Sequence, residues 1–537
     1  MNKSFFKYEP DEKMYVTDDY ISYSDGSEKY FIDLFNSVDV EDDSALLTHI
    51  EDWAIKYHLS QERINVISPF LDLFNVNGNV LEIGAGMGAI SRWLGKNFRH
   101  VDCIEGNINR ARALRARTRN MENVDIYAGN ALKTNLNACE YDLATLIGVL
   151  EYIPFYSDES PEESVVVFLR NIHNTLNDNG ILIISIENKF GLKYFSGCAE
   201  DHNGDMYSGL MDYPFKSAIT FGRNELESLI RQAGFSGVQF YHAYPDYKMP
   251  VSVFRECSEI YELNPDVFWP KQILDNIPRK HLFFEPLVIK SLFKEKMVHY
   301  FSNSFVILCS KSADTNLKTE WVFVKCTDPL INADYRHWIK IAPDKNRGGF
   351  LVEKKALNHN EDIKENNVFS VKLTNQEYVH GSALIMEAFK AFLAKDNYMS
   401  FLNLLSEIRG ELLKNSAGED EEGYPLVSGC FFDFCFWNLI RRDGKLIYFD
   451  NKWNGKEDMP VDYIIFRNIH NLRHYFIGYV TFNNFESFCA HFMSILFPAH
   501  NAKRLGYLVN LETRLITELL AQNAGMASPG REARKPA

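Results

Sequence analysis

The chain has 537 residues, enough for roughly two to four domains of ordinary size. Its 46% hydrophobic and 24% charged residues are typical of a globular protein, and a net charge of −15 argues against broad nucleic-acid binding. It has no apolar stretch of about 18 residues, no signal-peptide core, and no zinc-binding spacing among its nine cysteines. We therefore expect a cytoplasmic protein without a membrane span.

The chain begins with an acidic extension, residues 1–57, in which we expect a strand at 20–23. Residues 60–74 predict a helix that Ser60 caps. Its apolar positions recur at helical spacing and form one face, which we expect to pack on the first strand of the core.

The next segment, residues 80–89, reads as a short apolar strand followed by a glycine turn and a helix over 90–96. Glycines at 84, 86 and 88 let the backbone approach a ligand closely. The turn also directs the first free N–H groups of the helix toward that ligand. The pattern predicts a nucleotide-like cofactor.

The same residues also match the dinucleotide fingerprint G-x-G-x-x-A at 84–89, so the cofactor must be argued from their neighbours. Glu82, two residues before the first glycine, suits a cationic amino acid and would repel a pyrophosphate. The second strand, 101–105, ends in Glu105, about where a ribose diol is held. These positions favour an amino-acid-bearing nucleoside over a dinucleotide.

Strands and helices then alternate through about residue 185, with a strand from 141, a helix over 161–176 and a strand over 181–186. This alternation predicts a parallel, doubly wound sheet. A helix over 223–233 and a strand over 238–241 complete it, and 245–300 indicates an accessory subdomain.

The set of motifs over roughly 60–250 resembles the class I S-adenosylmethionine (SAM) methyltransferases. The resemblance implies that Glu82 and the glycine turn hold the methionine end of SAM, and that Glu105 binds the ribose hydroxyls. Asn130 and Ala131 stand beside the adenine, where the family often has Asp, and Gly148, Val149 and Glu151 line the mouth near the sulfonium. The residues of the turn are Gly84, Ala85, Gly86 and Gly88.

Several further segments resemble bacterial methyltransferases that are associated with glycosyltransferases and surface-polysaccharide assembly. They include residues 148–152, 187–194, 200–202 and 244–250. The resemblance implies a glycan or glycan-linked acceptor, glycosyltransferases as partners, and a peripheral place at the inner membrane face through those partners.

The polar loop 186–204 follows the carboxyl end of a strand, where ligands of such sheets bind, and is our candidate acceptor lid. A sugar hydroxyl needs a general base, whereas a phosphate acceptor does not. His202, beside Glu200 and Asp201, is the hypothesis for that base; the alternative is a surface histidine without a role. Glu151 lies nearer the expected methyl position and either acts in catalysis or shapes the pocket.

The C-terminal half carries a second constellation. Asp433 and Asn438 have the Asp-x4-Asn spacing of a kinase catalytic loop, and Asp450 ends a strand twelve residues further on. Phosphoryl transfer needs a carboxylate for the acceptor hydroxyl, here Asp433, and an amide and a carboxylate for magnesium, here Asn438 and Asp450. Upstream, Lys340 on a strand over 338–342 is the candidate phosphate-pairing lysine, and Glu353, on a helix over 350–357, its partner.

Residues 318–480 thus resemble the small-molecule kinases of the aminoglycoside and choline phosphotransferase type, which implies Mg-ATP. The chain departs from that pattern: no glycine-rich loop precedes Lys340, no His-Gly pair precedes Asp433, and Asn-Lys-Trp follows Asp450. An active kinase, a degenerate binding module and an unrelated α/β domain all stay open. The architecture resembles the enzymes that phosphorylate and methylate the ends of O-antigen chains.

We therefore expect an α/β chain in which a Rossmann-like class I methyltransferase precedes an α+β kinase-like domain. The predicted divisions are an extension (1–57), a methyltransferase (58–250), a connecting segment (251–315), a kinase-like domain (316–520) and a disordered tail (521–537). Three functions remain: a glycan O-methyltransferase, a bifunctional kinase and methyltransferase, and a non-catalytic assembly scaffold. The intact motif from Glu82 to Glu105 disfavours the scaffold.

Overall fold

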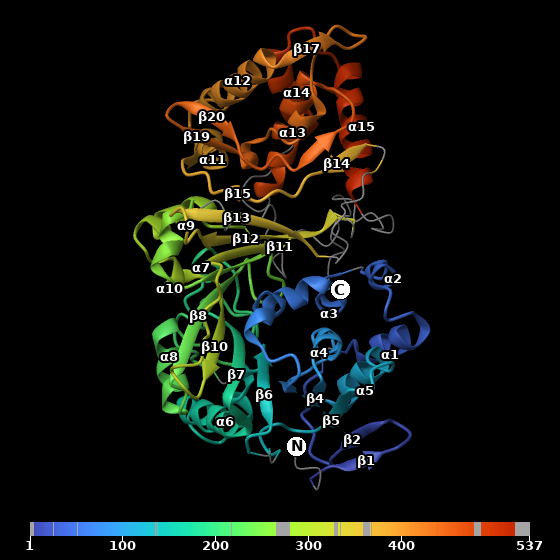
Figure 1. Cartoon of the computed structure of the whole chain (residues 1–537), viewed down its shortest axis with the longest axis vertical. Helices are drawn as coiled ribbons and strands as arrows, with labels where there is room; N and C mark the ends of the chain where they lie inside the picture. The colour runs from blue at the N-terminus through green and yellow to red at the C-terminus, as the bar shows by residue number, and fades with distance from the viewer. Residues whose placement is uncertain are drawn as a thin grey trace.

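The computed structural model describes residues 5–520 except for 25, 51, 135, 137, 216, 265–279, 327–330, 333–334, 358–365, 367 and 477–484. The predicted tail, 521–537, lies outside the described residues. One 14-stranded sheet runs through both halves of the molecule, in the order β1-β2-β5-β4-β3-β6-β7-β10-β8-β9-β11-β12-β13-β15 (Figure 1).

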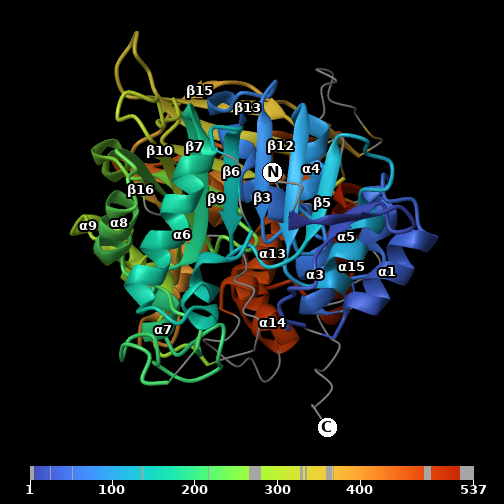
Figure 2. The same cartoon turned by 90° about the horizontal axis from the view of Figure 1, so that it is seen from below.

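Five parallel strands form the centre of the N-terminal half and lie side by side in Figure 2. They are β3 (Asn79–Ile83), β4 (His100–Glu105), β5 (Val124–Ala128), β6 (Tyr141–Ile147) and β7 (Leu176–Glu187). Their residues are buried almost continuously, because helices cover both faces of the sheet. The predicted parallel, doubly wound sheet is confirmed.

Alternate residues of each strand pack into different cores. On β3, Leu81 and Ile83 pack with α6 (Pro161–Thr175) and α8 (Arg223–Gln232). Val80, the residue before Leu81, packs on the other face with α4 (Ser91–Asn97) and α5 (Ile108–Arg117). This two-residue period places helices on both sides of the sheet.

The sheet takes one strand from the predicted connecting segment. Strand β10 (Ser304–Ser310) lies between β7 and β8 (Gly237–Tyr244) and is antiparallel to both. All seven of its residues are buried. Residues 251–315 therefore contribute a central strand, although their sequence indicates an accessory segment.

Antiparallel strands carry the sheet on toward the C-terminal half. Strand β9 (Ser252–Arg255) pairs with β8 and with β11 (Phe323–Cys326), which pairs with β12 (His337–Pro343). Strands β13 (Phe350–Ala356) and β15 (Gln376–Glu377) end it. The helix predicted over 350–357 is thus wrong: Phe350, Val352 and Lys354 are buried in alternation, as in a strand with one covered face.

The C-terminal half is built mainly of helices around a core of its own. Its helices are α11 (Leu384–Leu393), α12 (Met399–Lys414), α13 (Val461–Leu472), α14 (Phe485–Leu496) and α15 (Ala502–Leu519). Helix α13 is buried on nearly all sides, and the other helices surround it. Three small sheets complete this half: β16-β19-β20 (Ser382–Ala383, Leu439–Arg442, Lys445–Tyr448), β14-β21 (Phe369–Val371, Trp453–Gly455) and β17-β18-β22 (Ser416–Glu419, Pro425–Val427, Met459–Pro460).

The N-terminal extension packs against the parallel part of the sheet. Strands β1 (Lys7–Glu9) and β2 (Met14–Val16) extend the sheet beyond β5, and α1 (Glu28–Ser37), α2 (Asp43–Leu47) and α3 (Trp53–Leu59) follow. The strand predicted at 20–23 is not formed. The helix predicted over 60–74 is instead two 3₁₀ helices, η2 (Gln61–Val66) and η3 (Ser68–Leu73), because Pro69 lacks the N–H that a continuous α-helix needs.

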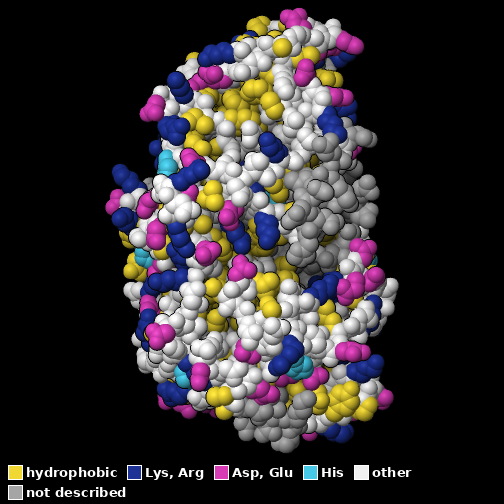
Figure 3. All heavy atoms as spheres, viewed as in Figure 1, with side chains coloured by type: hydrophobic (Ala, Val, Ile, Leu, Met, Phe, Trp, Pro, Cys, Tyr) yellow, Lys and Arg dark blue, Asp and Glu magenta, His cyan; other side chains and the backbone are white. Residues whose placement is uncertain are grey.

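Short helices connect the larger elements. They are η4 (Leu150–Tyr152), η5 (Pro154–Tyr156), α7 (Leu192–Phe195), η6 (Ser258–Glu262), α9 (Glu285–Lys294), α10 (Val298–Phe301), η9 (Gly429–Phe431), η10 (Phe436–Asn438) and η11 (Arg473–Tyr475). Acidic and basic side chains are interspersed over the face in Figure 3. Among the described residues, no helix is both long enough and apolar enough to cross a bilayer.

Candidate active site

The glycine turn after β3 has the backbone that its sequence predicts. Gly84, Gly86 and Gly88 have φ angles of +74°, +56° and +80°, a region that L side chains rarely adopt. A Cβ on Gly84 would lie 2.2 Å from Val149 Cγ2, and one on Gly88 would lie 2.7 Å from Leu114 Cδ1. At Gly86, by contrast, no described atom lies within 4 Å of that position. The two outer glycines are needed for packing, and the middle one opens onto free space.

The turn and the predicted ribose-binding acid meet. Glu105, at the end of β4, accepts hydrogen bonds from the Gly86 amide (2.7 Å) and the Asn107 amide (2.9 Å). Burial raises the pKa of this carboxyl group above its ordinary value. Glu105 therefore stands at the mouth of the turn and is hydrogen-bonded directly to it, at the edge where the sequence predicts the ribose.

Glu82 is buried on β3, behind the turn. Its Oε2 accepts a hydrogen bond from Cys103 Sγ at 3.3 Å. Burial raises the pKa of Glu82 to about 7. A nearby cation stabilises the ionised form of such a buried carboxyl group. The ammonium group of a bound methionine moiety would be such a cation. Ala85, between the first two glycines, is buried in the adjoining core.

Asn130 and Ala131 follow the end of β5. The Asn130 carbonyl oxygen of the side chain accepts from the Leu132 amide at 3.0 Å, and its backbone N–H donates to Asp19 O at 3.0 Å. Asn130 is buried, whereas Ala131 is half-buried. The side chain thus fixes the loop that would border the adenine.

The N-terminal extension crosses the same edge, which sequence analysis missed. Ile21 N–H donates to Gly106 O at 2.9 Å, and Asn107 Nδ2 donates to Tyr23 O at 2.6 Å. The Arg110 guanidinium lies 4.5 Å from the centre of the Tyr23 ring. Residues 19–23 therefore run across the carboxyl ends of β4 and β5. No periodic pattern in this acidic segment signals that position.

At the end of β6, Gly148 has a φ of +69°, and a Cβ there would lie 2.7 Å from Tyr247 Oη. Val149, the next residue, contacts the glycine turn at Gly84, as noted above. The structure therefore brings together the two segments predicted to surround the sulfonium, the 84–88 turn and Gly148–Val149.

His202 lies in a cluster of carboxylates, and its side chain is only 7% exposed. Its Nδ1 is 2.8 Å from Glu200 Oε1, and its Nε2 is 3.6 Å from Glu151 Oε1 and 3.8 Å from Glu187 Oε2. Burial lowers the pKa of the imidazole, but these carboxylates outweigh it and raise that pKa well above its ordinary value.

In this arrangement the carboxylates favour the protonated imidazole, which opposes a role for His202 as a general base. The base assigned to it from the sequence stays a prediction. Glu187, the last residue of β7, was not singled out from the sequence, because nothing in the linear order sets it opposite Glu151. Parallel strands bring their carboxyl ends to one edge of the sheet, and that edge unites the two glutamates.

Two lysines adjoin the cluster. Lys193 Nζ is 2.5 Å from Asp201 Oδ2 and 2.8 Å from Asp246 Oδ2. Lys248 forms an ion pair with Glu187, and its Nζ is 3.8 Å from Asp201 Oδ1. The candidate lid is thus tied to the 244–250 turn by buried ion pairs, which fix its position.

In the C-terminal half, the predicted catalytic loop is compact. Asn438 Nδ2 donates to Asp433 Oδ2 at 2.6 Å, and Trp437 Nε1 donates to Asp433 Oδ1 at 3.3 Å. Arg467, from α13, reaches the same carboxylate at 3.4 Å. Both Asp433 and Asn438 are buried. The Phe449 amide donates to Asn438 O at 3.1 Å and sets Asp450 beside the loop.

Asp450 is held by two lysines that sequence analysis missed. Lys354 Nζ and Lys452 Nζ each lie 2.7 Å from one of its carboxylate oxygens. Burial raises the pKa of Asp450, but the two ammonium groups outweigh it and hold that pKa well below its ordinary value. Asp450 is therefore ionised, as a metal-binding carboxylate must be.

Lys340 and Glu353 are not brought to this site. They face each other across β12 and β13. Lys340 Nζ points to Asp72, at 3.8 Å from Oδ2, and Glu353 is exposed. Successive side chains of a strand point to opposite faces, so Lys354, one residue after Glu353, lies on the Asp450 side. The alternation would have identified Lys354 if residues 350–356 had been predicted as a strand.

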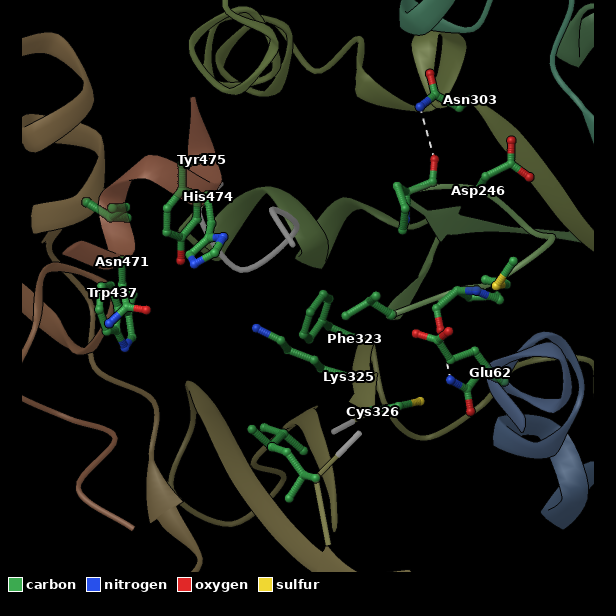
Figure 4. A pocket seen from close by; sticks show the side chains of 18 of the residues that line it. Glu62, Asp246, Asn303, Phe323, Lys325, Cys326, Trp437, Asn471, His474 and Tyr475 are labelled. Atoms are coloured by element: carbon green, nitrogen blue, oxygen red, sulfur yellow. Dashed lines mark hydrogen bonds between the residues drawn. The ribbon is translucent and has the colours of Figure 1, made fainter. Parts of the chain in front are cut away.

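One cavity of about 920 Å³ is lined at one end by the candidate lid and the 244–250 turn, and at the other by the Asp433–Asp450 cluster. Figure 4 shows Lys325, from β11, pointing into it between the two halves. The charged and amide residues at its two ends are Lys193, Glu200, Asp201, Asp246 and Lys248 on the N-terminal side, and Lys354, Asp433, Asn438 and Asp450 on the other. Aromatic side chains, among them Trp437 and Tyr475, line the C-terminal part.

Residues 55–239 match the family model described as a methyltransferase domain. Three solved structures are similar. A possible histamine N-methyltransferase from Thermotoga maritima is 17% identical over 47% of this chain and 91% of its own, with a TM-score of 0.27. Phosphoethanolamine N-methyltransferase 1 from Haemonchus contortus, solved with phosphoethanolamine and S-adenosylhomocysteine, is 15% identical over 55% and 50%, with a TM-score of 0.31.

A SAM-dependent methyltransferase from Archaeoglobus fulgidus is 14% identical over 47% of this chain and 93% of its own, with a TM-score of 0.30. A search of curated proteins found no match. The family match, together with the sheet and the glycine turn, defines residues 55–239 as a class I methyltransferase domain with a Rossmann-like fold. The enzyme is a SAM-dependent methyltransferase, and SAM is its cofactor. The match ends before the C-terminal half.

Proposed function

We propose that the enzyme transfers the methyl group of SAM to an oxygen atom of a glycan or glycan-linked group during bacterial surface-polysaccharide assembly. The cavity carries the proposal. It has a volume of about 920 Å³, begins at the lid of the methyltransferase domain, and combines charged groups with aromatic rings. Such a lining suits a large polar acceptor better than a small apolar one. The resemblance of residues 187–194 and 244–250 supports the polysaccharide class.

Methyl transfer is an in-line displacement, so the enzyme must align the acceptor oxygen, the methyl carbon and the sulfur. The acceptor oxygen attacks the methyl carbon, the S–CH₃ bond breaks, and its electron pair stays on sulfur in S-adenosylhomocysteine. A hydroxyl acceptor also loses a proton. Glu151 is placed to accept that proton, because it follows Gly148 by three residues and its Oε2 has no hydrogen-bond partner among the described residues.

The test incubates the purified enzyme with SAM carrying a labelled methyl group and with surface-glycan fractions, free sugars and amine acceptors. We expect label in the glycan, as an ether or a phosphate ester that mass spectrometry locates. Label only in amines, with SAM binding intact, would overturn the proposal. The inactive control is Gly86→Asp, whose side chain enters the opening at the turn.

A second function, phosphoryl transfer to the same acceptor, is favoured by one observation. Asp433, Asn438 and Asp450 come from one segment and Lys354 from a distant strand, β13, and the four meet at one end of the cavity. We propose that Asp433 orients the acceptor hydroxyl, that Asn438 and Asp450 hold magnesium, and that Lys354 pairs with phosphates. This assignment replaces Lys340 with Lys354.

Calorimetry with Mg·ATP tests this second function. We expect binding that Asp450→Asn abolishes and that Asp443→Asn leaves intact, since Asp443 is exposed at the tip of the β19–β20 hairpin. Equal heats for the two variants, or none for the unmodified chain, would reduce the C-terminal half to an acceptor-binding module.

A further inference from the structure

Three side chains at the edge of the methyltransferase sheet converge on one point. Glu151 comes from η4 after β6, Glu187 ends β7, and His202 comes from the lid. One ligand atom from each lies within 4.8 Å of the other two. The Nε2–oxygen separations are 3.6 and 3.8 Å. Ligands bound at about 2.1 Å to one ion are roughly 3.0–3.5 Å apart, so these two imidazole–carboxylate separations are less than about 1 Å too long for a shared ion.

The histidine is oriented as a metal ligand would be. Its Nδ1 is 2.8 Å from Glu200 Oε1, which leaves Nε2 toward Glu151 and Glu187. Glu200 is itself fixed, because its Oε2 accepts from the His202 amide (2.8 Å) and the Asn203 amide (3.0 Å). A carboxylate that holds the far nitrogen of a metal-bound imidazole is the usual outer partner of such ligands.

A second observation points to a missing cation. The Oε2 atoms of Glu151 and Glu187 have no hydrogen-bond partner among the described residues, although these residues are only 1% and 0% exposed. A buried carboxylate oxygen without a partner is costly. Counted as ionised, Glu151, Glu187 and Glu200 carry three negative charges, against one positive charge on Lys248 and one on a protonated His202. A divalent cation that replaces the imidazole proton brings these groups to neutrality.

The surrounding charges do not remove this imbalance. Asp201 and Asp246, which share Lys193, add two negative charges and one positive charge. The whole group therefore stays negative without a further cation. Glu200 and Lys248 line the cavity, so the cluster adjoins the space that an acceptor would occupy.

We propose that Glu151, Glu187 and His202 bind a divalent cation beside the SAM methyl group, and that this cation takes an oxygen atom of the acceptor as a further ligand. Two carboxylates and one imidazole suit Mn²⁺, Mg²⁺ or Zn²⁺ and leave positions for water and substrate. Binding of the ion does not depend on the proposed glycan acceptor, whereas its role in catalysis rests on that proposal.

The role follows from the chemistry of a Lewis acid. A hydroxyl bound to the cation loses its proton more readily, as metal-bound water does. The proton passes to Glu151, on the carboxylate oxygen that does not hold the cation, the resulting alkoxide attacks the methyl carbon, and S-adenosylhomocysteine leaves. For a phosphate acceptor the cation neutralises the oxygen next to the one that attacks. In both cases the ion fixes the acceptor in line with the sulfonium.

Mn²⁺ binding tests the site, with electron paramagnetic resonance as the readout and no acceptor present. Because Asp450 belongs to the other candidate metal site, the titration uses the Asp450→Asn protein. We expect one bound Mn²⁺ per chain, displaced by Mg²⁺ or Zn²⁺, with a ¹⁴N coupling from a bound imidazole. His202→Gln in that background should lose the coupling, and Glu187→Gln should weaken binding at least tenfold. Asp205→Asn, at an exposed residue immediately after the same lid, should change neither.

SAM calorimetry on each variant checks that it is folded. An Asp450→Asn protein that takes up none of the three ions, or one whose bound Mn²⁺ is untouched by His202→Gln, overturns the proposal whether or not a glycan is methylated. Conversely, a bound ion without glycan methylation overturns only the proposed acceptor.

Discussion

The contrast between Gly86 and its neighbours gives the sharpest test of where SAM lies. Gly86→Ala places a methyl group on a residue with φ +56°, at a point where no described atom lies within 4 Å. Alanine in the left-handed region costs about 1–2 kcal/mol, so the free energy of unfolding should fall by about that amount. No clash adds to it in the protein without cofactor.

The same methyl group projects into the open space beside the turn, more than 4 Å from Glu105, whose carboxylate accepts from the Gly86 amide at 2.7 Å. A cofactor that occupies this space must move away from the methyl group. We expect SAM affinity to fall at least tenfold, which corresponds to about 1.4 kcal/mol. Isothermal calorimetry measures the affinity, and denaturant unfolding measures the stability.

Gly348→Ala is the matched control. Gly348 has φ +76°, lies in the exposed turn between β12 and β13, and also has no described atom within 4 Å of its Cβ position. The two variants should lose similar stability, but only Gly86→Ala should lose SAM. Unchanged SAM affinity in Gly86→Ala would refute the assignment of this opening to the cofactor.

Three further outcomes are expected. Because burial raises the pKa of Glu82 to about 7, the cofactor-free protein should lose up to about 3 kcal/mol of stability as the pH rises from 4.5 to 7. SAM affinity should rise over the same range as Glu82 ionises to meet the ammonium group, and Glu82→Gln should remove both trends; a flat pH profile contradicts this. Lys354→Met should weaken Mg·ATP binding at least tenfold by calorimetry, whereas Lys355→Met, on the exposed face of β13, should not; equal effects would exclude Lys354. Tyr23→Ala should weaken SAM binding by a few-fold through loss of the Arg110 contact, and an unchanged dissociation constant would show that the extension does not cover the cofactor.

The features that were predicted correctly depend on local patterns. The glycine turn, the acid at the end of β4 and the alternation of strands and helices can each be recognised in a short window of sequence, and the structure contains all three. Glu105 and Gly86 meet because adjacent parallel strands end at the same edge. Their contact follows from the fold class once that class is recognised.

The features that were missed depend on contacts between distant segments. Strand β10 lies 60 residues after the strand beside it, β8, and nothing local places it between β8 and β7. Residues 350–356 read as a helix because Glu and Lys are good helix formers, but pairing with β12 overrides that preference. This one error led to the choice of Lys340 over Lys354. In a strand, Lys354 points to the face opposite Glu353, which is the face toward Asp450. The charge state of His202 depends on Glu187, which only the sheet brings near.

The course of the long sheet has a consequence for dissecting the enzyme. Because β10 (Ser304–Ser310) closes the gap between β7 and β8, a fragment that stops near residue 250 leaves two interior strands with bare hydrogen-bonding edges. Extending the fragment to residue 315 restores those pairs but uncovers β9, which otherwise pairs with β11. The two halves are therefore joined by the backbone hydrogen bonds between neighbouring strands of one sheet rather than by a linker. Gene fragments cut at either point should yield aggregating protein, so the two chemistries are best separated by point substitution within the intact chain.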